Sequence, residues 1–388
     1  GTVSSVGGAV TQNIGTKSAT TDAPTQFTDA AYDSVNQKII VVYRDSSTTD
    51  GKAVIGTISN TSISFGTPVT FATNSTSQVS VTYDTTNEKA VIAYQDLDNN
   101  VYGTAIVGTV SGTSMSFGTA VVFNSGSTSY TSTVYDTNAQ KVVISYKDNA
   151  NSNRGTAIVG TVSGTSISFG SEATFETTGV NFSVDSVYDT NAQKILISYR
   201  QHTNSYGFSV VGTVSGTSIS FGTPVVFNSA TTSNIAVAYD STNNKPIVIY
   251  RDHSDNNGKA LVASISGTAV SYGSTSSFST GSPIYMAASY SPNVQKLVIA
   301  YKDQTTTDSR FSVASISGTT ISFESSVQFD SGSNNVYEVV YDVANEKIFT
   351  SFDDTGNSNL LSAVVFTVGG TLQNLTSENY IGIARSGA

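Results

Sequence analysis

Residues 135–148, YDTNAQKVVISYKD, decide the fold because this stretch recurs along the chain with small changes. A Tyr-Asp pair is followed by a short polar turn, a lysine and an apolar run that ends in an aromatic residue. Successive copies start 51 to 53 residues apart, and such a steady period is typical of repeat architectures. The seven copies begin at Tyr32, Tyr83, Tyr135, Tyr188, Tyr239, Tyr290 and Tyr341.

Each copy contains four short runs with the composition of β-strands. In the third copy the second run is KVVISY at 141–146, the third is AIVGTVS at 157–163 and the fourth is SISFG at 166–170. Apolar residues at nearly every position of the second run indicate a strand that is covered on both faces. Four strands in about 50 residues match one propeller blade, whereas an immunoglobulin-like sandwich needs about 100 residues.

We therefore predict an all-β protein, a seven-bladed β-propeller of four-stranded antiparallel blades over residues 1–375. Residues 376–388 break the pattern and are expected to form an extension or the start of another module. The ring is expected to close by pairing of its N- and C-terminal segments. Either Gly8–Gly15 or Thr371–Leu375 would complete the blade that begins at Tyr341, since both segments carry the strand pattern.

Composition narrows the classes of function. The chain of 388 residues carries 18 Lys and Arg against 28 Asp and Glu, a net charge of −10, which argues against nucleic acid as a partner. No apolar run approaches the roughly 18 residues that a membrane span needs, so no membrane insertion is expected. The absence of cysteine excludes disulfides and thiolate metal sites.

The loops fall into two sets that should lie on opposite faces. Loops between strands one and two and between strands three and four are nearly uniform, whereas the two-to-three loops and the loops between blades vary. We call the second set's face the variable face. Variable loops on a rigid scaffold often carry recognition residues, and aromatic rings among polar residues suit sugars or protein partners. The alternative is that these are ordinary solvated loops. The candidate ligand-binding residues are Tyr102, Tyr130, Phe182, His202, Tyr206, His253, Tyr285 and Tyr337.

The second strand usually ends in an aromatic residue, a polar residue and an aspartate, as in YRD at 43–45 and YKD at 146–148. The recurring aspartate could form a ring of carboxylates at a binding mouth or cap its own loop. Its presence in nearly every blade favours capping. Two acidic loops are candidates for calcium but lack the glycine and distal glutamate of an EF-hand, so no metal or other cofactor is expected and calcium is the alternative. The residues concerned are Asp96, Asp98, Asp252 and Asp255.

Signals for catalysis are weak. There are two histidines, no cysteine and no HExxH or GxSxG motif with a plausible triad, so we predict no catalytic residues and no enzyme. A glycan-active enzyme is kept as an alternative, because the spacing of paired carboxylates is set in three dimensions.

Runs such as GTVSGTSISFGTPVVFNS at 212–229 resemble repeats in tail-fibre and adhesion-type proteins of marine bacteriophages. The ending NLTSENYIGIARSGA at 374–388 is similar to the start of a module that follows such arrays. This resemblance implies a structural protein of a virion or extracellular surface, with other virion or appendage proteins as partners, and supplies no site residues. We therefore predict a non-enzymatic virion fibre or host-recognition module that binds a host-surface glycan or protein through the variable face. A purely structural spacer and a secreted glycan-active enzyme are the alternatives.

Overall fold

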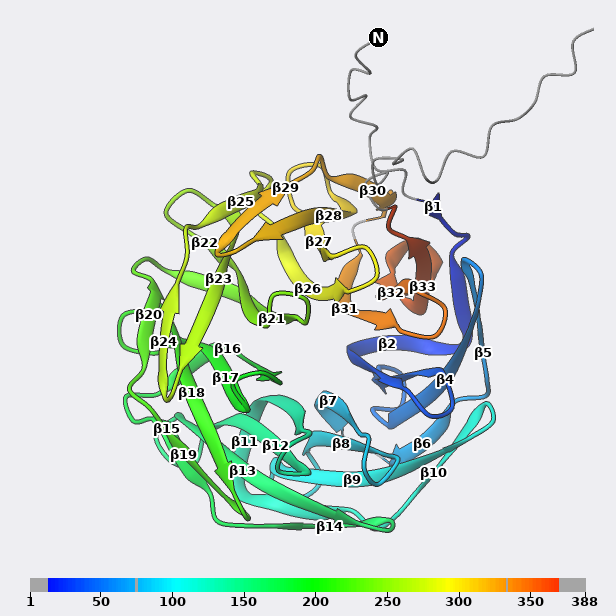
Figure 1. Ribbon diagram of the computed structural model, residues 1–388. Helices are drawn as coiled ribbons and strands as arrows, with labels where there is room; N and C mark the ends of the chain where they lie inside the picture. Colours follow the sequence, from blue (N-terminus) through cyan, green and yellow to red (C-terminus); the bar gives the residue numbers. More distant parts are fainter. Residues whose placement is uncertain (1–12, 74–75, 333, 370–388) are drawn as a thin grey trace, which may run out of the picture.

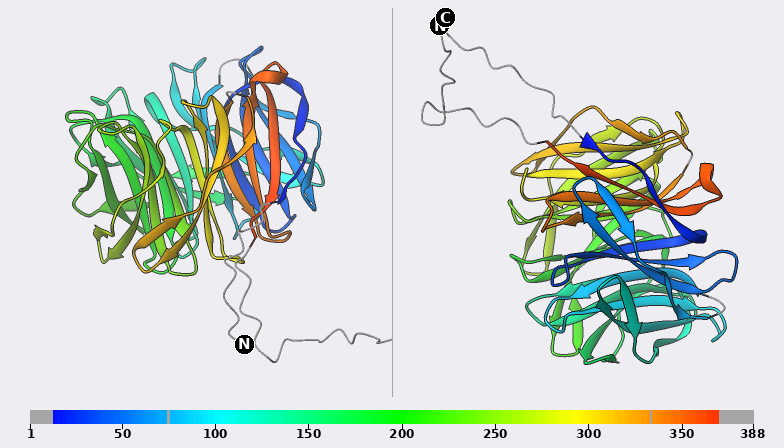
Figure 2. Two further views of the ribbon diagram at one scale, coloured as in Figure 1. Left: turned by 90° about the horizontal axis from the view of Figure 1, so that it is seen from above. Right: turned by 90° about the vertical axis from the view of Figure 1, so that its right-hand side faces the viewer.

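The computed structural model describes residues 13–73, 76–332 and 334–369. Regular structure in these ranges is β-strand except for the short 3-10 helix η1 (Thr355–Asn357), so the all-β prediction is confirmed. The sheets stand around a central axis (Figure 1), and their strands run between the two faces of a thick disc (Figure 2). No helix in the described ranges is long and apolar enough to cross a bilayer.

The strands repeat in antiparallel units that follow the sequence period, with the first strand of each unit nearest the centre. The first strands are β2 (Ser18–Asp33), β7 (Thr76–Asp84), β11 (Val121–Asp136), β16 (Val180–Asp189), β21 (Thr232–Asp240), β26 (Ile284–Ser291) and β31 (Asn335–Asp342). They neighbour one another in this order, and β31 lies beside β2. The second strands are β3 (Lys38–Asp45), β8 (Lys89–Asp96), β12 (Lys141–Asp148), β17 (Lys194–Gln201), β22 (Lys245–Asp252), β27 (Lys296–Asp303) and β32 (Lys347–Asp354).

The third and fourth strands form the outer part of each unit. The third strands are β4 (Gly51–Ser59), β9 (Tyr102–Ser111), β13 (Arg154–Ser163), β18 (Gly207–Ser215), β23 (Asn257–Ser266), β28 (Asp308–Ser317) and β33 (Leu360–Thr367). The fourth strand is broken into two pieces that pair with the two ends of the third. These pieces are β5 (Ser62–Phe65) with β6 (Val69–Ala72), β10 (Ser114–Phe117) with the start of β11, β14 (Ser166–Phe169) with β15 (Ala173–Glu176), β19 (Ser218–Phe221) with β20 (Val225–Asn228), β24 (Ala269–Tyr272) with β25 (Ser276–Ser279), and β29 (Thr320–Phe323) with β30 (Val327–Asp330).

The core lies between neighbouring units, as the two-sided apolar pattern of the second strands predicts. Every residue of Ile39–Tyr43 is at most 1% exposed. Alternate side chains of this strand join two clusters: Ile40 and Val42 pack with the second unit, and Val41 and Tyr43 pack with the seventh. Each sheet therefore hides its two apolar faces against its two neighbours.

An aromatic contact is repeated at these junctions. Phe71, on the fourth strand of the first unit, packs against Tyr94 on the second strand of the next unit, with ring centroids 5.4 Å apart. Gly51 makes room for this ring, because a Cβ there would lie 2.5 Å from the Phe71 ring atoms. The same contact joins Phe123 to Tyr146 and Phe227 to Tyr250.

The Tyr-Asp motif builds the turns and also couples successive units. The Asp84 carboxylate accepts hydrogen bonds from the backbone N–H groups of Thr86 and Asn87, both at 3.0 Å. The Tyr135 hydroxyl of the next unit donates to Thr86 Oγ1 at 2.7 Å. The Tyr32 hydroxyl likewise accepts from the Ala344 N–H at 3.2 Å, so the first and seventh units are joined in a similar way.

The seventh unit receives its outer strand from the start of the chain. β1 (Asn13–Ile14) and the first residues of β2 both pair with β33. A Cβ on Gly15 would lie 1.7 Å from the Thr61 carbonyl oxygen, a close approach that recurs between Gly66 and Thr113. Asn13–Gly15 therefore takes the place of a fourth strand. The rest of the predicted segment Gly8–Gly15, its rival Thr371–Leu375 and the predicted extension 376–388 lie outside the described residues.

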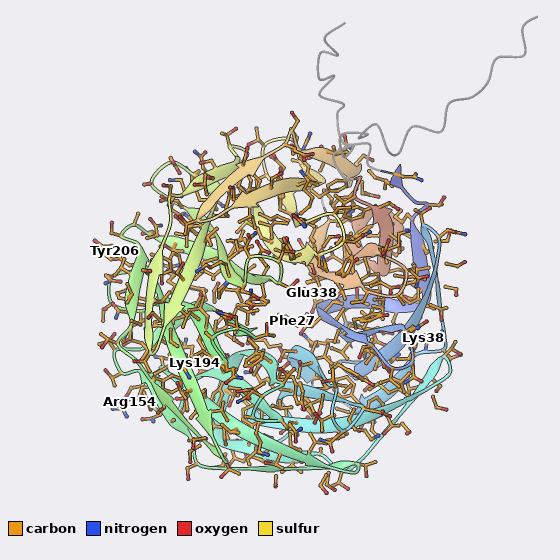
Figure 3. All side chains as sticks on the ribbon, in the orientation of Figure 1. Phe27, Lys38, Arg154, Lys194, Tyr206 and Glu338 are labelled. Atoms are coloured by element: carbon orange, nitrogen blue, oxygen red, sulfur yellow. The ribbon has the colours of Figure 1, made fainter. Side chains whose placement is uncertain are left out.

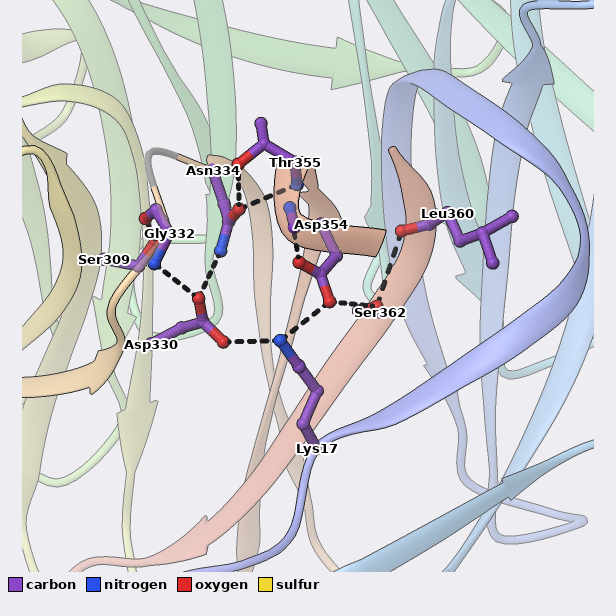
Figure 4. Close-up of polar contacts among 10 residues, drawn as sticks. Lys17, Ser309, Asp330, Gly332, Asn334, Asp354, Thr355, Leu360 and Ser362 are labelled. Carbon is purple, nitrogen blue, oxygen red and sulfur yellow. Dashed lines mark hydrogen bonds and ion pairs between the residues drawn. The ribbon is translucent and has the colours of Figure 1, made fainter. Parts of the chain in front are cut away.

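A polar clasp reinforces this junction (Figure 4). Lys17 Nζ lies 2.8 Å from Asp330 Oδ2 and 2.7 Å from Asp354 Oδ2. Asp330 also accepts from the Gly332 N–H and from Asn334 Nδ2. One lysine of the N-terminal segment is thus fixed by carboxylates of the sixth and seventh units.

Candidate functional site

A cavity of about 500 Å³ occupies the centre of the ring and is lined by the first strands of all seven units. A second pocket, of about 440 Å³, shares Phe27, Tyr285 and Tyr337 with this cavity. It also includes Ser46 and Thr355, which belong to two-to-three loops. The end of the cavity that carries these aromatic rings therefore opens on the variable face, and we call it the mouth.

A β-bulge in each first strand shapes the mouth. In the second unit the bulge separates the pairs Ser77–Gln95 and Ser80–Ala93, and the other units have a similar irregularity. In six units a bulge residue adopts a left-handed backbone with φ between 48° and 62°. Such a φ is unusual for bulky residues, and bulges often re-aim side chains near functional sites. These residues are Phe27, Gln78, Tyr130, Phe182, Asn234 and Tyr285.

Aromatic rings at the mouth remain accessible to solvent. The exposed fraction is 39% for Phe27, 57% for Phe182 and 43% for Tyr285. Tyr130 contacts Phe182 edge-on at 6.4 Å between centroids, and Tyr285 contacts Tyr337 at 6.5 Å. Exposed aromatic side chains on a rigid scaffold offer flat apolar surfaces, and little conformational entropy is lost when a ligand binds to them.

Basic side chains accompany these rings. In five units a basic residue directly follows the aromatic residue of the second strand. Gln95 and Asp353 occupy this position in the other two units. Lys147 Nζ lies 5.9 Å from the Tyr130 centroid, and Arg200 Cζ lies 5.2 Å from the Phe182 centroid. No ion pair of the described part of the chain involves these five cations. They are Arg44, Lys147, Arg200, Arg251 and Lys302.

Units three, four and six each place a cation over a ring, and unit five between them adds Arg251. We call this part of the mouth the crescent. It consists of Tyr130, Phe182, Tyr285, Lys147, Arg200, Arg251 and Lys302.

A layer of smaller and acidic residues lines the cavity below the rings. The Asp29 carboxylate accepts from the Val81 N–H of the next unit at 2.7 Å, and the Asp185 carboxylate accepts from the Val237 N–H at 2.9 Å. Burial raises the pKa of Asp29 to about 7 and that of Asp185 to about 6. Burial and the neighbouring Asp29 carboxylate raise the pKa of Glu338 well above its usual value. Burial and the repulsion between the two carboxylates therefore both favour the protonated forms of Asp29 and Glu338.

The structure divides the predicted ligand-binding residues into two groups. Tyr130, Phe182, Tyr285 and Tyr337 come together around the central cavity. Tyr206 lies at the outer edge of the ring, whereas Phe27 and Glu338 lie at its centre (Figure 3).

The other three predicted residues lie outside the lining of the central cavity. The His202 N–H donates to the Gly179 carbonyl at 2.9 Å, and Tyr102 starts β9 as the register partner of Asp96. His253 Nε2 lies 2.7 Å from Ser233 Oγ on an exposed loop. Burial, with Arg251 and Arg200 nearby, lowers the pKa of His253.

The acidic loops are occupied by their own contacts. Lys259 Nζ lies 2.7 Å from both Asp252 Oδ2 and Asp255 Oδ2, and an ammonium group thus stands where calcium was considered. Asp96 accepts from the Asn99 N–H at 3.3 Å, as a loop-capping aspartate does. Among the residues that the structure describes, no three His, Asp or Glu side chains gather as metal ligands.

Two features of the mouth are missing from the sequence prediction. Phe27 lies five residues before the Tyr-Asp motif of its unit, and Tyr130 and Tyr285 occupy the same position in their units. Alignment of the units therefore predicts Phe27 as a mouth residue. The cations occupy the middle position of the YRD and YKD strand ends, a position that the prediction did not use. The Asp45 carboxylate caps its loop by accepting a hydrogen bond from the Ser47 N–H at 2.8 Å.

Comparison with known proteins places the fold. No protein-family model and no curated protein matches the chain. Among solved structures it is similar to the BP39L lectin from Burkholderia pseudomallei, with TM-score 0.64, 11% identity, and coverage of 90% of this chain and 99% of that one. It is also similar to the Cps50 β-propeller domain of Myceliophteria thermophila, with TM-score 0.54, 5% identity, and coverage of 91% and 100%. A NanB sialidase variant from Streptococcus pneumoniae gives TM-score 0.52 and 9% identity over 90% and 69%. At these identities the likeness shows a β-propeller fold.

Proposed function

We propose that this protein is a recognition module that binds a carbohydrate at the mouth of the variable face. The observation that carries the proposal is a set of solvent-exposed aromatic rings around one cavity, each contributed by a different unit. Phe27, Phe182 and Tyr285 are between 39% and 57% exposed. Sugars expose apolar C–H faces that stack on such rings, and nearby amide and hydroxyl groups supply hydrogen bonds. The lectin among the similar structures supports this proposal at the level of fold.

We propose further that the module belongs to a virion fibre or a cell-surface appendage and meets a host-surface glycan. The support is the resemblance of the repeats to tail-fibre and adhesion-type proteins. In this setting the ring is a seven-bladed propeller, closed by the N-terminal segment on β33. The pairing of Asn13 with Thr367 and the contact of Lys17 with Asp354 support that closure.

The proposal is tested on a glycan array with the full chain and the double variant Phe182→Ala/Tyr285→Ala. We expect the parent to bind selected glycans and the variant to bind them about tenfold or more weakly, since each stacking contact contributes about 0.5–1.5 kcal/mol beyond area burial. Val343→Ala is the matched control, because Val343 is also an exposed apolar residue and lies on a Tyr-Asp turn. A parent that binds no glycan would favour the structural-spacer alternative.

The enzymatic alternative rests on the raised pKa of the cavity carboxylates, which is a property of general acids. Asp29 and Asp185 are, however, tied to the backbone of neighbouring strands, a bonding pattern that suits a structural role. Release of sugars from bound polysaccharide, abolished by Glu338→Gln, would favour the enzyme over the binding module.

A further inference from the structure

The crescent carries more positive charge than a site for neutral sugars needs. Resting on the carbohydrate-binding function proposed above, we propose that it binds an anionic polysaccharide, one whose sugars bear carboxylate or sulfate groups. The rings would stack on the sugars, and the ammonium and guanidinium groups between them would pair with the acidic groups.

The first argument is the placement of charge. The chain has a net charge of −10 and 18 Lys and Arg residues in all, yet four consecutive units each place one basic side chain in the crescent. A one-signed cluster on an oppositely charged protein creates a local field that attracts anions. Burial, helped by the charges of Arg251 and Arg200, lowers the pKa of His253, which is consistent with a positive field there.

The second argument is that the two arginines have neutral partners, whereas Lys302 also lies near the Asp353 carboxylate and favours its charged form. Arg251 donates to the amide oxygens of Gln304 at 2.9 Å and Asn256 at 3.0 Å. Arg200 donates to Ser205 Oγ at 2.8 Å, and Lys302 donates to Asn335 Oδ1 at 3.3 Å. The Nε–H groups of Arg200 and Arg251 are buried without a partner. Neutral oxygens orient a guanidinium and leave its charge available for a carboxylate or sulfate, which it can bind through two parallel hydrogen bonds.

The third argument is the alternation of rings and cations. Arg200 lies over Phe182, Lys147 over Tyr130 and Lys302 over Tyr285, at 5.2 to 5.9 Å from the ring centroids. Each ring of the crescent therefore has a charge beside it, and this arrangement recurs in three of the four units of the crescent.

A single-stranded nucleic acid also combines flat rings with negative charge. The acidic balance of the whole chain disfavours it, because a phosphate at every nucleotide would also run over the surrounding carboxylates. An anionic glycan needs to place only a few charges, all of them within the crescent.

The test compares three dextran polymers, which share one backbone, with a single-stranded nucleic acid. Binding of the full chain to dextran, carboxymethyl dextran, dextran sulfate and a single-stranded oligothymidylate is measured at several salt concentrations. The variants are Arg200→Gln/Arg251→Gln in the crescent and Arg154→Gln/Lys194→Gln as a control with the same loss of charge. Figure 3 places Arg154 at the outer edge of the ring. A thermal melt checks folding, and Lys147→Gln/Lys302→Gln replaces the first pair if that pair does not fold.

We expect one or both charged dextrans to bind at least about tenfold more tightly than dextran, with an affinity that falls as salt rises. The crescent variant should lose about tenfold or more for the charged dextran and the control variant less than about twofold. Equal binding of neutral and charged dextrans, equal losses in both variants, or tighter binding of the oligonucleotide would overturn the inference. Binding of dextran that is lost only in Phe182→Ala/Tyr285→Ala would overturn it while leaving the proposed function standing. If no polysaccharide binds, here or on the array, the proposed function itself fails.

Discussion

The two ends of the first strands differ in how completely their polar groups are satisfied. At the turn end, Asp84 accepts three hydrogen bonds from Thr86 and Asn87, and in five other units the corresponding aspartate accepts at least two from its own turn. At the mouth end, Phe182 and Tyr285 are exposed with a left-handed backbone, and Arg200 and Arg251 donate to neutral oxygens. The repeat is therefore uniform at the turn end, where contacts within the protein satisfy the polar groups. It varies at the mouth end, where a bound molecule would supply the remaining contacts.

Loss of a turn aspartate should have the largest effect on stability and none on binding. For Asp84→Ala we expect the free energy of unfolding to fall by about 2–3 kcal/mol, because hydrogen bonds to a buried charged group are lost together. Denaturant titration measures this, and glycan binding measures the mouth. Thr85→Ala, at an exposed position of the same turn, should change stability by less than about 0.5 kcal/mol. A loss of glycan binding by a folded Asp84→Ala would break the separation of the two ends.

The cavity carboxylates between the two ends should make stability depend on pH. The folded pKa of Asp29 is raised to about 7, so the folded state binds more protons than the unfolded state between roughly pH 4 and pH 7. The contribution of these carboxyl groups to the free energy of unfolding therefore falls as pH rises through this window. Glu338→Gln should remove part of the dependence and be more stable than the parent by about 1–2 kcal/mol at pH 7.5, a figure reduced for partial exposure to water.

Parent and Glu338→Gln should converge in stability near about pH 3, below the ordinary pKa of glutamate, where the carboxyl group is protonated in both states. Asp185 remains in the variant and continues to titrate, since its pKa is also raised. Unfolding by urea at a series of pH values checks the prediction. Parallel pH profiles for the two proteins would contradict the raised pKa of Glu338.

The bulges predict a smaller effect. Phe182 has φ of 62°, so Phe182→Gly should be more stable than Phe182→Ala by about 1 kcal/mol, although both variants lose the ring. In the regular part of the same strand the order should reverse, with Val187→Ala more stable than Val187→Gly by about 0.5–1 kcal/mol. Thermal melts of the four variants decide it. The same order at both positions would mean that the mouth stores no backbone strain.

The sequence was sufficient for the features that local contacts determine. The Asx turn at Asp84 and the fully covered strand Ile39–Tyr43 follow from short motifs and apolar pattern, and both are present. The mouth depends instead on register and on a bulge between distant pairs, which bring Phe27, Phe182 and Tyr285 to one cavity and leave Tyr206 at the outer edge of the ring. Cations and rings that lie about 20 residues apart in the chain meet only once β16 pairs with β17, as Phe182 and Arg200 do.

The N-terminal strand on β33 has a consequence for synthesis on the ribosome. Thr20 Oγ1 donates to the Leu361 carbonyl, 341 residues away, and replaces a contact that other units make within about twenty residues. A nascent chain must therefore carry the edge of β2 unpaired until nearly every later unit has emerged. Six units can be stacked by then, and an exposed edge is open to wrong partners during that delay.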